Sequence, residues 1–97
     1  MAIFMVGYDL HEGEDYKNLT DTLEKYSTWW HCLDSTWLIK SDDTAAKIRT
    51  NLRQHMTEGD SLLVMRYGKT HTGKGKGKNA SWFGFEGECR NWLSTNL

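Results

Sequence analysis

The stretch A-I-F-M-V-G-Y-D-L, residues 2–10, decides the fold that this sequence predicts. No charged residue occurs in it before Asp9, so it is typical of a β-strand that is covered on both faces. Asp9 stands where the apolar run ends. This pattern predicts a rigid strand with one carboxylate at its end. There the Asp9 side chain is able to reach solvent, a metal or a substrate.

The chain has 97 residues and a formal net charge of -1. This length favours a single domain, and the near-neutral charge gives no general attraction to nucleic acid. No apolar run approaches the roughly 20 residues of a membrane helix, so we expect a soluble, cytoplasmic protein without a membrane partner. Cys32 and Cys89 lack metal-site spacing, and we interpret both as buried thiols in a reducing compartment.

Two segments show helical spacing of apolar residues. The first follows Asp15, a candidate helix cap, and the second follows Asp42 or Asp43, either of which is a candidate cap. The apolar positions of the first helix are Tyr16, Leu19, Leu23 and Tyr26, and those of the second are Ala45, Ile48, Leu52 and Met56.

The remaining segments favour strands. Residues 27–40 predict either two antiparallel strands joined by a tight turn at Asp34 and Ser35, or one long strand with a bulge there. Residues 61–67 predict a further strand that is apolar on both faces up to Arg66. Residues 80–85 predict a short aromatic strand, and the last residues predict a brief helix.

This order predicts an α+β fold: a single ferredoxin-like βαββαβ domain over residues 1–97, with an appended strand and a short terminal helix. Both main helices are expected on one face of an antiparallel sheet, with the first and third strands in its centre. The central strands are apolar on both sides, so the other face needs a cover. A homodimer formed by packing two open sheet faces together would supply it.

Asp9 is the leading candidate for a metal ligand and catalytic residue. Mg²⁺ binds through few carboxylates and keeps several waters, so a dimer that pairs two Asp9 side chains would suit it. The alternative is that Asp9 is a turn residue, a common role for aspartate. Ser35 is a candidate donor to a phosphate oxygen, although such a serine often bonds within its own turn.

Residues 68–79 form a basic loop in which lysines alternate with glycines. Ammonium groups and flexible backbone amides are both able to bind phosphates, and Arg66 lies just before the loop. The alternative is a solvated connection without a ligand. The candidate nucleic-acid-binding residues are Arg66, Lys69, Lys74, Lys76 and Lys78.

Several short motifs resemble the CRISPR-associated protein two family, and most closely its compact SinR-like branch. The motifs are Tyr8–Leu10, Trp29–His31, Leu33–Trp37 and Gly59–Val64, and the resemblance covers residues 2–85 in order. It implies a ferredoxin-like homodimer in which the last strand often crosses to the partner. It also implies a metal-dependent nuclease that uses the aspartate matching Asp9, with the matching serine nearby.

The related virulence-associated protein D is a ribonuclease of toxin type. The sequence departs from the CRISPR pattern at two polar positions of the second strand, which are occupied here by His31 and Leu33. Two functional hypotheses follow. The first is a nucleic-acid-acting homodimer, active as a Mg²⁺-dependent endonuclease on RNA or DNA. The second is a non-catalytic module, such as a regulator, an antitoxin-like protein or a phage-encoded inhibitor, with a protein partner.

Overall fold

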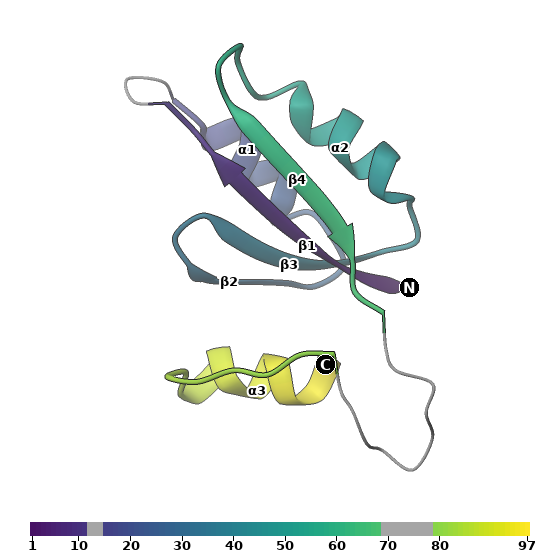
Figure 1. Ribbon diagram of the computed structural model, residues 1–97, viewed down its shortest axis with the longest axis vertical. Coiled ribbons are helices and arrows are strands. Elements are labelled where there is room, and N and C mark those ends of the chain that lie inside the picture. The colour runs from purple at the N-terminus through teal and green to yellow at the C-terminus, as the bar shows by residue number, and fades with distance from the viewer. Residues whose placement is uncertain (12–14, 69–78) are drawn as a thin grey trace.

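The computed structural model describes residues 1–11, 15–68 and 79–97. These residues form a four-stranded sheet and three helices, which makes the protein an α+β domain (Figure 1). The strands are β1 (Ala2–Asp9), β2 (Trp29–Leu33), β3 (Thr36–Ser41) and β4 (Ser61–Arg66), and the helices are α1 (Lys17–Leu23), α2 (Ala45–Arg53) and α3 (Gly87–Asn96).

The sheet has the order β2-β3-β1-β4, and all neighbouring strands are antiparallel. The prediction that the first and third strands lie in the centre is therefore confirmed. Val6 of β1 is opposite Trp37 of β3 and Val64 of β4. A tight turn at Asp34 and Ser35 joins β2 to β3, so the two-strand interpretation of residues 27–40 is also confirmed, and an irregularity of register lies within β2.

One face of the sheet is sealed by α1 and α2, which lie together on one side of it (Figure 1). Alternate residues of the central strands point to this face because successive side chains of a strand alternate. They meet the apolar positions of both helices, as the helical spacing predicts. The buried core comprises Phe4, Val6, Leu19, Leu23, Trp37, Ile39, Ile48, Leu52 and Met56.

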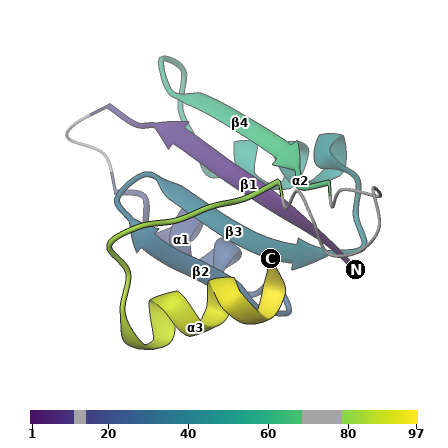
Figure 2. The same cartoon turned by 60° about the horizontal axis from the view of Figure 1, so that its bottom comes forward.

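The opposite face is partly covered by the C-terminal segment, which we define as residues 79–97. Residues 79–86 return from the end of β4 towards β2, and α3 then lies next to β2 (Figure 2). The prediction of a strand over residues 80–85 is wrong, because these residues form no strand in the structure. Gly84 has a φ of 90°, a conformation that favours glycine and does not fit an extended strand.

Cys32 and Cys89 form a disulfide that links β2 to α3. The interpretation of these residues as free thiols is therefore wrong. Their separation of 57 residues gave no spacing signal, because the partners meet only when the C-terminal segment folds back on the sheet. A crosslink closing a loop of this length stabilises the folded chain by roughly 4 kcal/mol in the loop-entropy model.

The starts of the two predicted helices differ in detail from the sequence-based expectation. Thr44 caps α2, because its hydroxyl accepts a hydrogen bond from the Lys47 amide at 3.1 Å. The predicted caps Asp42 and Asp43 are therefore wrong. Asp15 does accept a hydrogen bond from the Lys17 amide at 2.9 Å, although the residue at the cap position is Tyr16.

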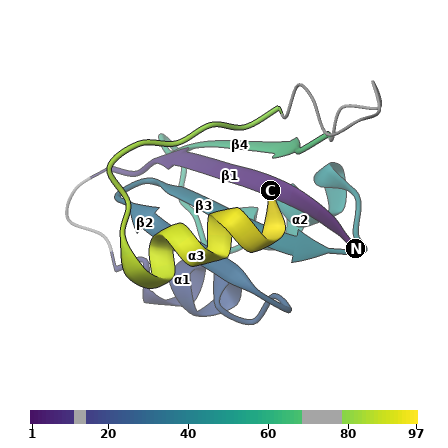
Figure 3. The same ribbon diagram turned by 90° about the horizontal axis from the view of Figure 1, so that it is seen from below.

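Both chain ends lie at the same end of the molecule (Figure 3), the end where β1 begins. Asp9, the last residue of β1, lies at the other end of the sheet. Within residues 1–11, 15–68 and 79–97, no helix is long and apolar enough to cross a membrane.

Candidate functional site

Asp9 is exposed at the last position of the central strand β1. Its backbone is held in register opposite Ser61 of β4, so the carboxylate stands on a rigid element. Among the described residues, this carboxylate takes part in no hydrogen bond or ion pair. That observation does not favour the turn-residue alternative, in which an aspartate would bond to nearby backbone amides.

Ser35 lies at the same end of the sheet as Asp9. Its carbonyl accepts a hydrogen bond from the Tyr8 amide at 3.1 Å, which fixes the β2–β3 turn beside the end of β1. Strand alternation places Asp9 on the same face as Met5 and Gly7. No hydrogen bond joins Asp9 to Ser35 in the part of the chain that the structure describes, so a single copy brings the two residues to one end without direct contact.

Arg66 lies at the opposite end of the sheet from Asp9. It is paired with Phe4, whereas Asp9 is paired with Ser61, and the strand between Phe4 and Asp9 extends about 17 Å. Arg66 is exposed. The predicted phosphate-binding residues Lys69, Lys74, Lys76 and Lys78 lie outside the described residues. Beside them, the Asn79 side chain donates a hydrogen bond to the Gly68 carbonyl.

A buried carboxylate, Asp60, lies next to the exposed one. Asp60 directly precedes β4, and its side chain is only 1% exposed. The His11 ring and the Tyr16 hydroxyl donate hydrogen bonds to it at 2.7 and 2.8 Å. The amides of His11 and Thr57 donate at 3.0 and 2.9 Å. Asp60 therefore ties the residues after β1 and before α1 to the turn that begins β4.

These contacts set the ionisation of Asp60. Burial disfavours the charged carboxylate, but the hydrogen bonds from the Thr57 and His11 amides, and then those from the Tyr16 and His11 side chains, outweigh it. Together they hold the pKa of Asp60 well below its usual range. Asp60 is consequently an ionised carboxylate whose oxygens are already occupied by protein donors, which suits a structural role.

The Asp60 network was not predicted from the sequence. A local signal was present. Gly59 has a φ of 97°, and the Asp60 amide donates to the Thr57 carbonyl at 3.1 Å, so residues 57–60 form a tight turn. Aspartate in such a turn commonly accepts from nearby amides, but the contacts with His11 and Tyr16 depend on the tertiary fold.

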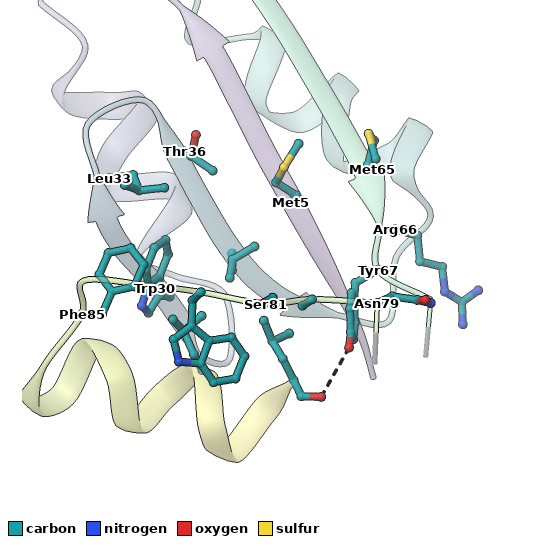
Figure 4. A pocket seen from close by; sticks show the side chains of 15 residues that line it. Met5, Trp30, Leu33, Thr36, Met65, Arg66, Tyr67, Asn79, Ser81 and Phe85 are labelled. Carbon is teal, nitrogen blue, oxygen red and sulfur yellow. Dashed lines mark hydrogen bonds between the residues drawn. The ribbon is translucent and has the colours of Figure 1, made fainter. Parts of the chain in front are cut away.

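The sheet face that carries Asp9 is apolar and incompletely covered. Leu33, Leu63 and Met65 are 48%, 54% and 51% exposed. Between this face and the C-terminal segment lies a cavity of about 320 Å³. Met5, Met65, Trp30 and Phe85 are among the side chains that line it (Figure 4).

Comparison with protein-family models, curated proteins and solved structures gives no match. The described residues also contain no cluster of three or more His, Cys, Asp or Glu side chains suited to a metal ion. In a single copy, the described residues therefore bring no set of metal ligands together around Asp9.

Proposed function

We propose that this protein acts on nucleic acid as a ferredoxin-like homodimer and cleaves it with Mg²⁺ bound by Asp9. The observation that carries the proposal is the exposed Asp9 carboxylate, which has no protein partner among the described residues and stands at the end of a central strand. The strand order β2-β3-β1-β4 supports the ferredoxin-like assignment. The resemblance to the CRISPR-associated protein two family is consistent with both parts of the proposal.

The homodimer would supply a second copy of the Asp9 carboxylate. Leu63 and Leu33 lie in a row with Gly7, two residues from Asp9 along β1, and both side chains are about half exposed. Packing this row against a second copy would bury apolar surface, which favours association. A two-fold axis near the row would bring the two Asp9 side chains close together.

Two carboxylates and several waters suit Mg²⁺, which seldom uses a cage made only of protein ligands. When bound, the metal ion would activate a water molecule and stabilise the charge that develops on a phosphodiester. Asp9 holds the ion, and the rigid strand fixes its position relative to the substrate. Ser35 donates a hydrogen bond to a phosphate oxygen of a substrate that lies along this end of the sheet.

Arg66 and the basic loop would bind phosphates distant from the cut. Because Phe4 and Asp9 are about 17 Å apart along β1, a substrate must span roughly five base pairs of duplex to reach both regions. Binding is therefore expected to depend on substrate length and to weaken steeply with added salt, since lysine and arginine release counterions from the phosphates.

The test is a cleavage time course on single-stranded RNA and duplex DNA with Mg²⁺. We expect Asp9→Asn and EDTA each to reduce the rate by about 100-fold or more. Asp42→Asn is the matched control, because Asp42 is exposed and lies at the end of the sheet where β1 begins. Equal rates in wild type and Asp9→Asn, or no cleavage by a folded dimer, would contradict the proposal.

A second candidate is a non-catalytic binding module with a protein partner. It is favoured by the exposed apolar side chains, among which Phe83 is 96% exposed. An aromatic side chain with this exposure is suited to a partner's hydrophobic pocket. In this case Asp9→Asn would leave partner binding unchanged, whereas Phe83→Ala would weaken it.

A further inference from the structure

The C-terminal segment is held to the rest of the protein mainly at β2. The disulfide between Cys32 and Cys89 joins the two covalently. At the same place the Trp30 indole donates to the Cys89 carbonyl at 3.0 Å, and the Trp92 indole donates to the Thr28 hydroxyl at 2.8 Å. At the end of the segment, the Tyr67 hydroxyl donates to the Leu97 carbonyl at 3.3 Å (Figure 4).

The non-covalent packing of this segment is sparse. Leu93 is the one buried side chain of α3. Residues 79–86 contain no helix or strand, and in them Phe85 packs edge-to-face on Trp30 with 5.1 Å between ring centroids. A helix of ten residues is marginal in water without tertiary packing. The position of α3 therefore depends strongly on the covalent link.

The cavity of about 320 Å³ beneath the segment also indicates that the segment packs loosely on the sheet. It lies between the segment and the apolar sheet face, where Met5 and Leu38 occupy the central strands. This space is partly open to solvent, so the segment and the sheet face do not interlock as side chains do in a well-packed interior. The segment thus covers this face without filling the space between them, and it loses contact energy that a sealed interface would provide.

We propose that the Cys32–Cys89 disulfide is a redox latch that holds the C-terminal segment over the apolar sheet face. Reduction by a dithiol releases the segment while the four-stranded sheet and its two covering helices stay folded. Both cysteines are only partly buried, so a thiolate can approach the bond.

The reduction balances as a thiol–disulfide exchange. A thiolate of the dithiol attacks one sulfur, the Cys32–Cys89 bond breaks, and the other cysteine leaves as a thiolate. The second thiol of the reductant then resolves the mixed disulfide and forms its own disulfide. Two electrons pass to the protein, and each cysteine gains a proton.

Release changes the surface of the protein. Trp30 and Leu38, now beneath the segment, would join the side chains of Leu33, Leu63 and Met65, which are already exposed. The result is one continuous apolar surface on the face that carries Asp9. This inference is independent of the proposed cleavage activity, because it concerns only what covers the sheet.

The test is hydrogen–deuterium exchange on the full chain, oxidised with glutathione disulfide or reduced with a dithiol, with the thiols counted by alkylation after unfolding. We expect amides of α3 to exchange at least about tenfold faster after reduction, while amides of β1 and β3 change less than about twofold. The double variant Cys32→Ser/Cys89→Ser is the matched control. It is expected to behave like the reduced protein and to be insensitive to the dithiol.

Three results would overturn the latch. The first is unchanged exchange in α3 after complete reduction, which would show that the other contacts suffice. The second is an equal acceleration in β1 and β3, which would show that the disulfide holds the entire fold. The third is two alkylatable thiols in the protein treated with glutathione disulfide, which would show that the bond does not form.

Discussion

Asp9, the last residue of β1, and Asp60, which directly precedes β4, lie at the same end of the sheet, and their carboxylates have opposite surroundings. Asp9 is opposite Ser61, the residue that directly follows Asp60. The Asp60 side chain is 1% exposed and accepts hydrogen bonds from five groups, whereas Asp9 is exposed and has no partner among the described residues. Position in the sheet therefore does not distinguish a structural carboxylate from a candidate ligand. The distinction is whether protein donors already occupy the carboxylate oxygens.

This difference assigns separate tasks to the two residues. Asp60 joins His11 and Tyr16 to the turn at residues 57–60. It thereby holds the residues that follow β1 against the turn that precedes β4. Asp9 contributes no such link, and its removal should not disturb the fold. A metal ion or a phosphate-bound water could use the oxygens of Asp9 without breaking any contact in the described part of the protein.

The largest expected effect is on thermal stability. Asp60→Ala should lower the Tm by about 10 °C or more, because it removes the buried acceptor that donors of His11, Tyr16 and Thr57 share. Asp9→Ala should change the Tm by less than about 2 °C, as is usual for an exposed side chain without contacts. Circular dichroism melts of the two variants and the wild type measure both shifts. Similar Tm values for the two variants would remove the contrast.

The next effect is the acid sensitivity that Asp60 introduces. Its pKa is depressed in the folded protein, so ionised Asp60 stabilises the fold above the ordinary aspartate pKa of about 3.9. This contribution is lost as the pH falls below that value towards the folded pKa. Urea unfolding between pH 7 and pH 3 should therefore show stability decreasing below about pH 4.

Asp60→Asn is the control for this pH dependence, because its amide cannot ionise. The variant is expected to be less stable than the wild type at pH 7, and the difference should shrink as the pH falls. A constant difference between the two proteins from pH 7 to pH 3 would mean that the ionisation of Asp60 is not coupled to folding.

Much of the fold was predictable because local patterns and the tertiary structure agree on the face covered by α1 and α2. Apolar residues at helical spacing, such as Ile48 and Leu52, meet the buried residues Phe4 and Val6 of the first strand. The two-strand interpretation of residues 27–40 followed from the polar turn at Asp34 and Ser35. For these segments the period of the pattern was sufficient.

The C-terminal segment was less predictable because its position depends on long-range contacts. The aromatic residues of 80–85 have strand propensity, but they pack through single contacts such as that between Phe85 and Trp30. The pairing of Cys32 with Cys89 links residues 57 positions apart, and no local pattern encodes it. The sequence patterns also did not predict that the chain itself covers the second face of the sheet, because this cover depends on long-range contacts.

The candidate site was predicted in part. The end of an uncharged apolar run correctly placed Asp9 at the end of a strand, and the turn after β2 placed Ser35 at the same end. The importance of Asp60 was not apparent, because its donors His11 and Tyr16 are more than 40 residues away in sequence. The two aspartates carry the same charge, so the sequence alone did not distinguish their roles. Their hydrogen-bond contacts in the described residues do distinguish them.

The smallest expected effect on the Tm comes from one hydroxyl group that donates to Asp60, that of Tyr16. The Tyr16 hydroxyl lies 2.8 Å from both carboxylate oxygens of Asp60, and Tyr16→Phe removes this donor while keeping the ring. We expect the Tm to fall by about 3–6 °C, since hydrogen bonds to charged groups are stronger than neutral ones. The loss should be smaller in the Asp60→Asn background, where the charged acceptor is absent, and unchanged in the Asp9→Asn background. A double-mutant cycle from melts of the six proteins measures both couplings. Equal losses in all three backgrounds would mean that Tyr16 stabilises the protein through its other contacts and that Asp60 is not the centre of the network.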